Sequence, residues 1–221
     1  MASAAVDAGS AVNVQPILTL SGKIIAVTGA NRGIGLGVAE CCLLNNAAKV
    51  YSIDLAEPGE DFAAASKQFP GRLFAITANV TDEASITAAI DKIVEESGAI
   101  HGVVCNAGRT NHKAALDFSK EEIETLFGVN AGVRNMAHTL AMEWAKYGIR
   151  VNSVSPGLVR TAMTYWVPQQ PDWEQQLKYY GGMPRLAEVQ ELGGAYVYLL
   201  SDAASYTTSI DIPVNGVIGI C

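Results

Sequence analysis

The sequence has few basic residues, few histidines and no paired cysteines, and each shortage excludes a class of function. Lysine and arginine together number 15 against 22 aspartates and glutamates, which gives the 221-residue chain a net charge of −7. This acidic balance, without any basic run, argues against a nucleic-acid partner. The three histidines lie outside any His/Cys cluster or HExxH motif, so a metal site is not expected. The four cysteines show no CxxC spacing and fit free thiols in a reducing compartment, so we expect a cytoplasmic protein.

The chain also has no apolar run that approaches membrane-spanning length, so no membrane partner is expected. Its first 17 residues lack the basic start and the apolar core of a secretory signal, and we predict a flexible tail over residues 1–17. Residues 18–221 are expected to form a single domain, because no repeat or linker divides them and 49% of all residues are hydrophobic.

Short apolar runs alternate along the chain with amphipathic stretches of helical spacing. The apolar runs are predicted strands at residues 23–29, 49–54, 72–77, 101–108, 149–156 and 209–214. The amphipathic stretches are predicted helices at residues 32–44, 60–69, 82–97 and 187–200. This alternation predicts an α/β fold of the Rossmann type, a doubly wound parallel sheet with helices on both faces.

The first predicted strand ends in a glycine-rich turn, TGANRGIG, that leads directly into the first predicted helix. Glycines at 29, 33 and 35 let the backbone approach a pyrophosphate, and the helix N-terminus supplies free N–H groups and a positive dipole end. Asp54 ends the next strand, where a carboxylate accepts hydrogen bonds from the ribose hydroxyls of NAD. The alternative is a tight turn without a ligand. We favour a dinucleotide site because the turn and the carboxylate occur together.

From about Leu18 onward the chain resembles the short-chain dehydrogenase/reductase family, and in detail it is similar to fungal-type polyol and sugar reductases and to dehydrogenases of secondary metabolism. The motifs are the TGxxxGxG turn, an Asn79-Val80 pair where the family has Asp-Val, the NAG sequence that begins at Asn106, and the IRVNSVSPG stretch that ends at Gly157. The resemblance implies a cofactor-binding set of Thr28, Gly29, Asn31, Arg32, Gly33, Ile34, Gly35, Asp54, Asn79, Val80, Asn106, Ala107, Gly108, Pro156, Gly157, Val159 and Thr161.

The catalytic pattern of that family is missing from the chain. The resemblance implies a helix with Tyr-x-x-x-Lys and a preceding strand that ends in a serine. In the family the tyrosine transfers the substrate proton, the lysine lowers the pKa of the tyrosine and holds the ribose, and the serine orients the carbonyl. No tyrosine of this sequence is followed four residues later by a lysine. Asn130, which resembles the family's active-site asparagine, is the one candidate catalytic residue that is left.

The break in the pattern lies between Asn130 and Ala131. The sequence before it resembles the helix after the family's fourth strand, and the sequence after it resembles what directly follows the catalytic lysine. About one supersecondary unit, roughly 30–40 residues, is therefore missing, including one strand. Apolar residues keep helical spacing across the break, from Ile123 to Trp144. We therefore predict one long helix through the join and a sheet of six strands in place of seven.

The sequence leaves the choice of cofactor and the nature of the substrate pocket open. Asp54 repels a 2′-phosphate and favours NAD, whereas Arg32 would pair with that phosphate and favour NADP; between the two we expect NAD. The aromatic residues after Thr161 either line an apolar pocket for a bulky or cyclic substrate or pack a lid or subunit interface; they are Tyr165, Trp166, Trp173, Tyr179 and Tyr180.

Two functions follow from the residues and the resemblance. The first is an NAD- or NADP-dependent oxidoreductase that interconverts a secondary alcohol and a ketone in a small-molecule substrate, either a polyol or sugar or an intermediate of secondary metabolism. The second is a non-catalytic dinucleotide-binding protein or an incomplete variant, which the absent serine, tyrosine and lysine favour. A homo-oligomer is also implied, because tetramers are common in the family.

Overall fold

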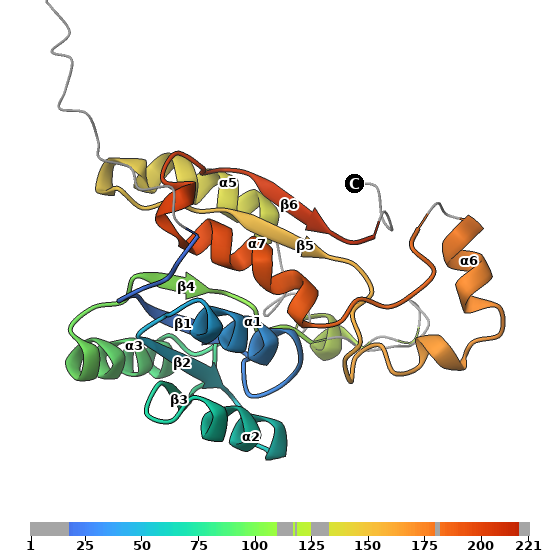
Figure 1. Ribbon diagram of the computed structural model, residues 1–221, viewed down its shortest axis with the longest axis horizontal. Coiled ribbons are helices and arrows are strands. Elements are labelled where there is room, and N and C mark those ends of the chain that lie inside the picture. The colour runs from blue at the N-terminus through green and yellow to red at the C-terminus, as the bar shows by residue number, and fades with distance from the viewer. Residues whose placement is uncertain (1–17, 110–116, 118, 125–132, 180–181, 217–221) are drawn as a thin grey trace, which may run out of the picture.

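The computed structural model describes residues 18–109, 117, 119–124, 133–179 and 182–216. Helices cover both faces of the parallel strands, so the chain is built in three layers (Figure 1). The expected tail at residues 1–17 and the expected helix across Asn130 and Ala131 fall outside the described residues. Both therefore stay predictions.

Four strands form the main sheet, in the order β3-β2-β1-β4 with all neighbours parallel. Their bounds are β1 Ile24–Thr28, β2 Lys49–Asp54, β3 Leu73–Thr77 and β4 Gly102–Val104. All five residues of β1 are buried, as is typical of a parallel strand that is covered on both faces. This order places the C-terminal ends of β1, β2 and β4 side by side at one end of the sheet.

Alternate residues of β1 face opposite helical layers. Ile25 and Val27 pack with residues of α1 and α2 on one face, and Ala26 packs with residues of α3 on the other. These helices are α1 Gly33–Leu44, α2 Glu60–Gln68 and α3 Glu83–Ser97. Helix α3 begins directly after Asp82, whose carboxylate accepts a hydrogen bond from the backbone N–H of Ala84 at 3.0 Å.

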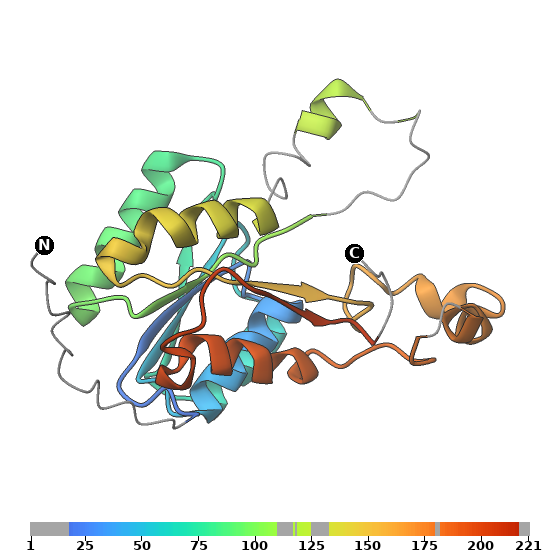
Figure 2. The ribbon, with the colours of Figure 1, turned by 90° about the horizontal axis from the view of Figure 1, so that it is seen from above.

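The C-terminal half contains a two-stranded parallel sheet, β5 Ser153–Pro156 and β6 Asp211–Val214. The hydroxyl of Ser153 donates to the carboxylate of Asp211 at 2.7 Å, and the hydroxyl of Ser155 donates to the same carboxylate at 2.9 Å. These bonds connect the two strands. Helix α7 lies on the α1 side of the strands and helix α5 on the α3 side (Figure 2). The helices of this half are α5 Val133–Trp144, α6 Trp173–Tyr179 and α7 Gln190–Leu200, with 3₁₀ turns at Ala145–Tyr147, Val167–Gln169 and Asp202–Ala204.

The doubly wound parallel α/β fold is confirmed, but the six described strands differ from the single sheet that we predicted. Strands β4 and β5 are not hydrogen-bonded to each other, and Val103 of β4 is 50% exposed although its β1 partner Ala26 is fully buried. Helix packing holds β5 in place instead. Arg150, just before β5, donates to the carbonyl oxygens of Leu199 (2.7 Å) and Ser201 (3.4 Å) at the end of α7. Since α7 packs on α1, helices rather than a strand ladder join the two sheets.

Small residues allow α1 and α7 to approach closely. A Cβ atom on Gly193 of α7 would lie 2.1 Å from the sulfur of Cys41, and one on Gly37 of α1 would lie 2.8 Å from the side chain of Val189. Gly194, the neighbour of Gly193, faces open space, with nothing within 4 Å of an added Cβ atom. The contact therefore requires glycine at 37 and 193 but not at 194.

We expect Gly193→Ala and Gly194→Ala to change stability in opposite directions. The added methyl group at 193 overpacks the contact with Cys41 and should lower the free energy of unfolding by about 1–3 kcal/mol. At 194 the higher helix propensity of alanine should raise it by up to about 1 kcal/mol. Urea denaturation of both variants measures the difference. Equal effects at the two positions would mean that α1 and α7 do not pack through Gly193.

Candidate functional site

The turn between β1 and α1 lies at the C-terminal end of the main sheet, and its glycines make it tight. Gly29 and Gly33 have left-handed φ angles of 65° and 59°, which favour glycine. A Cβ atom on Gly35 would lie 2.4 Å from the carbonyl oxygen of Gly29 and 2.5 Å from the side-chain nitrogen of Asn106. Only glycine fits at 35, and the N-terminus of α1 therefore comes close to the ends of β1 and β4.

Thr28 and Asn106 fix the ends of β1 and β4 to each other. The Asn106 side chain donates to the carbonyl oxygens of Thr28 (2.9 Å) and Gly29 (3.1 Å). The hydroxyl of Thr28 accepts hydrogen bonds from the backbone N–H groups of Asn106 (3.0 Å) and Ala107 (2.9 Å). The structure thus brings the NAG segment directly beside the glycine turn.

Asp54 ends β2, and its carboxylate is tied to the glycine turn. One carboxylate oxygen accepts from the N–H of Asn31 and the other from the N–H of Ala56, both at 3.1 Å. The buried side chain of Asn31 accepts from the hydroxyl of Ser52 (2.7 Å) and donates to the carbonyl oxygen of Ala56 (2.6 Å). Arg32, the next residue, is exposed just before α1. The turn and the carboxylate form one hydrogen-bonded unit, which sequence spacing alone does not reveal.

Asn79 and Val80 follow β3 at the same end of the sheet, and Val80 is 37% exposed. The side-chain oxygen of Asn79 accepts hydrogen bonds from the N–H (3.0 Å) and the hydroxyl (2.8 Å) of Thr81. The side-chain oxygen of Asn79, which the resemblance places in the cofactor-binding set, is therefore already engaged in a local turn. Asparagine side chains commonly bond the backbone two residues further on in this way. The role of Asn79 stays a prediction.

The segment after β5 reaches this site from the other half of the chain. A Cβ atom on Gly157 would lie 2.5 Å from the carbonyl oxygen of Asn215, so the segment passes closely beside the end of β6. The methyl carbon of Thr161 lies 3.7 Å from where a Cβ atom on Gly33 would be. The structure therefore brings together four predicted groups of site residues, at 28–35, 54, 106–108 and 156–161.

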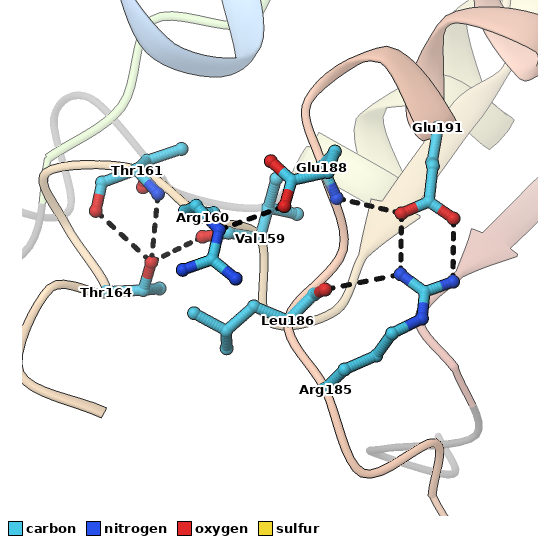
Figure 3. A network of polar contacts seen from close by, with 8 residues as sticks. All are labelled: Val159, Arg160, Thr161, Thr164, Arg185, Leu186, Glu188 and Glu191. Atoms are coloured by element: carbon cyan, nitrogen blue, oxygen red, sulfur yellow. Dashed lines mark hydrogen bonds and ion pairs between the residues drawn. The ribbon is translucent and has the colours of Figure 1, made fainter. Parts of the chain in front are cut away.

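A polar network anchors this segment to the start of α7 (Figure 3). Arg160 Nε donates to the carboxylate of Glu188 at 2.9 Å, and the guanidinium of Arg185 forms two hydrogen bonds with Glu191, at 2.7 and 2.8 Å. Hydrogen bonds from the Arg185 side chain and from the backbone N–H of Glu188 lower the pKa of Glu191 to about 2, so this carboxylate is ionised at neutral pH. We did not single out these residues in the sequence, because only the fold brings them together.

The described aromatic side chains after Thr161 are half-buried or exposed. Trp166 and Trp173 are half-buried, whereas Tyr165 is 66% exposed and Tyr179 85% exposed. Tyr180 lies outside the described residues. Exposure of this degree is compatible with both alternatives, a substrate pocket and a subunit contact.

The cysteines near the site are poor nucleophiles. Cys105 directly follows β4; the residue is exposed, but partial desolvation of its thiol raises the pKa. Burial, together with the neighbouring Cys41, raises the pKa of Cys42 in α1 to about 12. Both thiols are therefore neutral at pH 7, and a neutral thiol reacts slowly.

Asn130, the candidate catalytic residue, lies outside the described residues.

The described residues also bear on two other kinds of site, a metal site and a membrane span. In this part of the chain, no group of three or more His, Cys, Asp or Glu side chains is placed to hold a metal ion. None of the helices that the structure describes has both the length and the apolar character of a membrane span.

Two family models match the chain and together cover most of it. One is described as short chain dehydrogenase and matches residues 23–131. The other is described as enoyl-(acyl carrier protein) reductase and matches residues 129–216. The two matches meet where we predicted the join between Asn130 and Ala131.

Relatives and solved structures agree with these matches. The chain is 30% identical to an acetoacetyl-CoA reductase of Synechocystis sp., over 90% of this chain and 97% of the relative. It is 25% identical to an NADP-dependent mannitol dehydrogenase of Hypocrea jecorina, over 90% of this chain and 93% of the relative. These alignments run over 245 and 253 positions, although the chain has 221 residues. A gluconate 5-dehydrogenase of Burkholderia cenocepacia in complex with NADP and tartrate has a TM-score of 0.81 at 23% identity, over 90% of this chain and 96% of that chain.

Proposed function

The chain belongs to the short-chain dehydrogenase/reductase family, and from this premise we propose that it holds NAD or NADP at the C-terminal end of its main sheet. The reaction class of the proposal is the interconversion of a secondary alcohol and a ketone. The observation that carries the proposal is the convergence of the glycine turn and Asp54 with Asn106 and Thr161, which come from both halves of the chain.

The residues gathered here fit a dinucleotide. The left-handed backbone at Gly29 and Gly33 leads into the start of α1, where free N–H groups and the positive end of the helix dipole suit a pyrophosphate. The first turn of α1 contains no acidic residue that would repel this group. The carboxylate of Asp54 suits the ribose hydroxyls. The cofactor, when bound, supplies the transfer of hydride, and the residues of the chain hold and orient it.

We propose NAD rather than NADP as the preferred cofactor, and Asp54→Ser tests both this preference and the site. Serine removes a negative charge whose repulsion of a 2′-phosphate is worth about 1–4 kcal/mol near a protein surface, so the ratio of the two affinities should shift roughly ten-fold or more toward NADP. Calorimetric titration with NADH and NADPH measures both dissociation constants.

The matched control for this experiment is Asp91→Ser, because Asp91 is an exposed aspartate in α3. It should leave the ratio unchanged. Wild-type protein that is folded but binds neither dinucleotide would refute the proposed function. An unchanged ratio in Asp54→Ser would mean that Asp54 does not face the ribose.

The substrate class is proposed from two observations. One relative is named for mannitol and one solved structure of the same fold for gluconate, which supports a polyol or sugar, whereas another relative is named for acetoacetyl-CoA. The aromatic residues that follow Thr161 would favour a bulkier substrate, such as an intermediate of secondary metabolism, if they line the pocket rather than a subunit contact. A cytoplasmic location and a homo-oligomer, by analogy a tetramer, are parts of the same proposal.

One set of observations favours a second candidate function, a non-catalytic or incomplete variant. The sequence has no Tyr-x-x-x-Lys, its relatives align over more positions than it has residues, and the two family matches meet at Asn130 and Ala131. Together they support the loss of one internal unit that carries the catalytic residues. Sequencing the transcript across the codons for Asn130 and Ala131 tests this: a continuous reading frame there supports a genuine product, and intervening codons contradict it.

A further inference from the structure

Thr164 lies in the loop that carries Thr161, and its hydroxyl binds the backbone of this loop. The hydroxyl donates to the carbonyl oxygen of Val159 and accepts a hydrogen bond from the N–H of Thr161 at 3.1 Å (Figure 3). The carbonyl oxygen of Thr161 also lies 3.2 Å from it. One short side chain thus joins three backbone groups and fixes the course of the loop.

The base of the loop is fixed to the segment before α7. Val159 is 2% exposed and pairs with Ala187 in a parallel bridge. The N–H of Arg160 donates to the carbonyl oxygen of Ala187 at 2.8 Å, and the N–H of Ala187 donates to the carbonyl oxygen of Leu158 at 2.9 Å. Val189, two residues further on, packs against α1. The loop is therefore held in place relative to α1, the helix that follows the glycine turn.

Thr161 presents its hydroxyl in a defined way within this frame. The N–H of Met163 donates to the hydroxyl oxygen of Thr161 at 3.2 Å, and the methyl group of Thr161 lies beside Gly33. This bond uses one of the two lone pairs of the Thr161 oxygen, and the hydroxyl hydrogen is the group that Thr161 can donate to a ligand. Carbonyl and phosphate oxygens, which a dinucleotide carries, are suitable acceptors.

We infer that Thr164 is a positioning residue for the dinucleotide: its hydroxyl holds the loop so that Thr161 is kept next to the glycine turn. Thr164 acts through the backbone and need not touch the cofactor. The inference rests on the proposed function, because it concerns the same site. Without the hydroxyl, the carbonyl oxygen of Val159 and the N–H of Thr161 lose their partner, and the loop gains freedom that binding must then remove.

Thr164→Val removes the hydroxyl and keeps the shape of the side chain, whereas Thr164→Ser keeps the hydroxyl. We expect calorimetric titration with NADH and NADPH to show roughly ten-fold weaker binding for Thr164→Val, as for the loss of one well-made hydrogen bond. Thr164→Ser should bind with nearly wild-type affinity. Thr139→Val is the matched control, because the hydroxyl of Thr139 also donates to a backbone carbonyl, that of Asn135 at 3.2 Å, but lies in α5.

Thermal unfolding without dinucleotide separates positioning from folding. A Thr164→Val variant that unfolds at a lower temperature but binds with wild-type affinity would overturn the inference and leave the proposed function intact. Wild-type protein that binds no dinucleotide would overturn the proposed function itself. If the valine variant does not fold, hydrogen exchange of the wild type decides. The amides of residues 159–164 should exchange more slowly once NADH or NADPH is added, and unchanged exchange would overturn the inference.

Discussion

Purified protein should reduce ketones at least ~10²–10⁴-fold more slowly than the same chain with the missing unit restored between Asn130 and Ala131. Hydride transfer to a carbonyl carbon needs a proton for the oxygen, and this sequence has no Tyr-x-x-x-Lys to supply it. Water must then act as the acid, which raises the barrier by roughly 3–5 kcal/mol. Loss of the lysine and the serine adds to this, because misplacing a reacting group by about 1 Å can cost ~10²-fold.

The assay uses NADH and NADPH with a panel of cyclic ketones and ketoses. The restored unit is taken from a complete relative such as the mannitol dehydrogenase. A matched control carries the same unit with its tyrosine replaced by phenylalanine, which returns the length and the strand but not the acid, and it should stay slow. Comparable turnover by the original and the restored chain would show that another group carries the proton and that the break is wrongly placed.

Replacing Gly35 with alanine should cost both stability and dinucleotide affinity. The new methyl group would lie 2.4 Å from the carbonyl oxygen of Gly29. The backbone of Gly29 is held in place, because its N–H donates to the carbonyl oxygen of Ile53 at 2.8 Å. The methyl group would also lie 2.5 Å from the side-chain nitrogen of Asn106, which is held by two carbonyl oxygens. Neither neighbour can give way, so we expect the free energy of unfolding to fall by about 1–3 kcal/mol. Affinity should fall at least ~10-fold, because the N-terminus of α1 must shift away from the turn.

Gly194→Ala is the control for this substitution, since it adds the same methyl group to a helix at a position with open space. It should bind NADH and NADPH as the wild type does. Urea denaturation and calorimetric titration measure the two effects separately. A Gly35→Ala protein with wild-type stability and affinity would mean that the turn has room which the structure does not show.

Patterns that lie within one segment predicted several elements closely, although the strands expected at 101–108 and 149–156 are shorter in the structure. The run at 49–54 has the bounds of β2, and the stretch at 82–97 contains all of α3. Side-chain periodicity is a property of one segment, so it can be read from the sequence without knowing how distant segments pack. The glycine turn and the carboxylate at the end of β2 were predicted for the same reason, because each occupies a fixed place relative to its own strand.

Features that depend on contacts between distant segments were not predicted. The gap between β4 and β5 concerns strands with about one fifth of the sequence between them. The anchoring of Thr161 depends on a hydroxyl at Thr164 and on the segment before α7, neither of which has a distinctive motif. The engagement of Asn79 by Thr81, in contrast, is local, and we did not predict it because Asn79 was identified only through the resemblance to an Asp-Val pair.

The division of the strands into two sheets also bears on how the chain unfolds. Among the described strands no ladder crosses from β4 to β5, so the contact of α1 with α7 carries much of the connection between the halves. Each half is then free to open as its own cooperative unit, and the two-stranded half should open at the lower free energy, because so small a sheet is marginal by itself. A dinucleotide that contacts Gly33 in one half and Thr161 in the other would bind only when both halves are folded, so it would couple their unfolding into one transition.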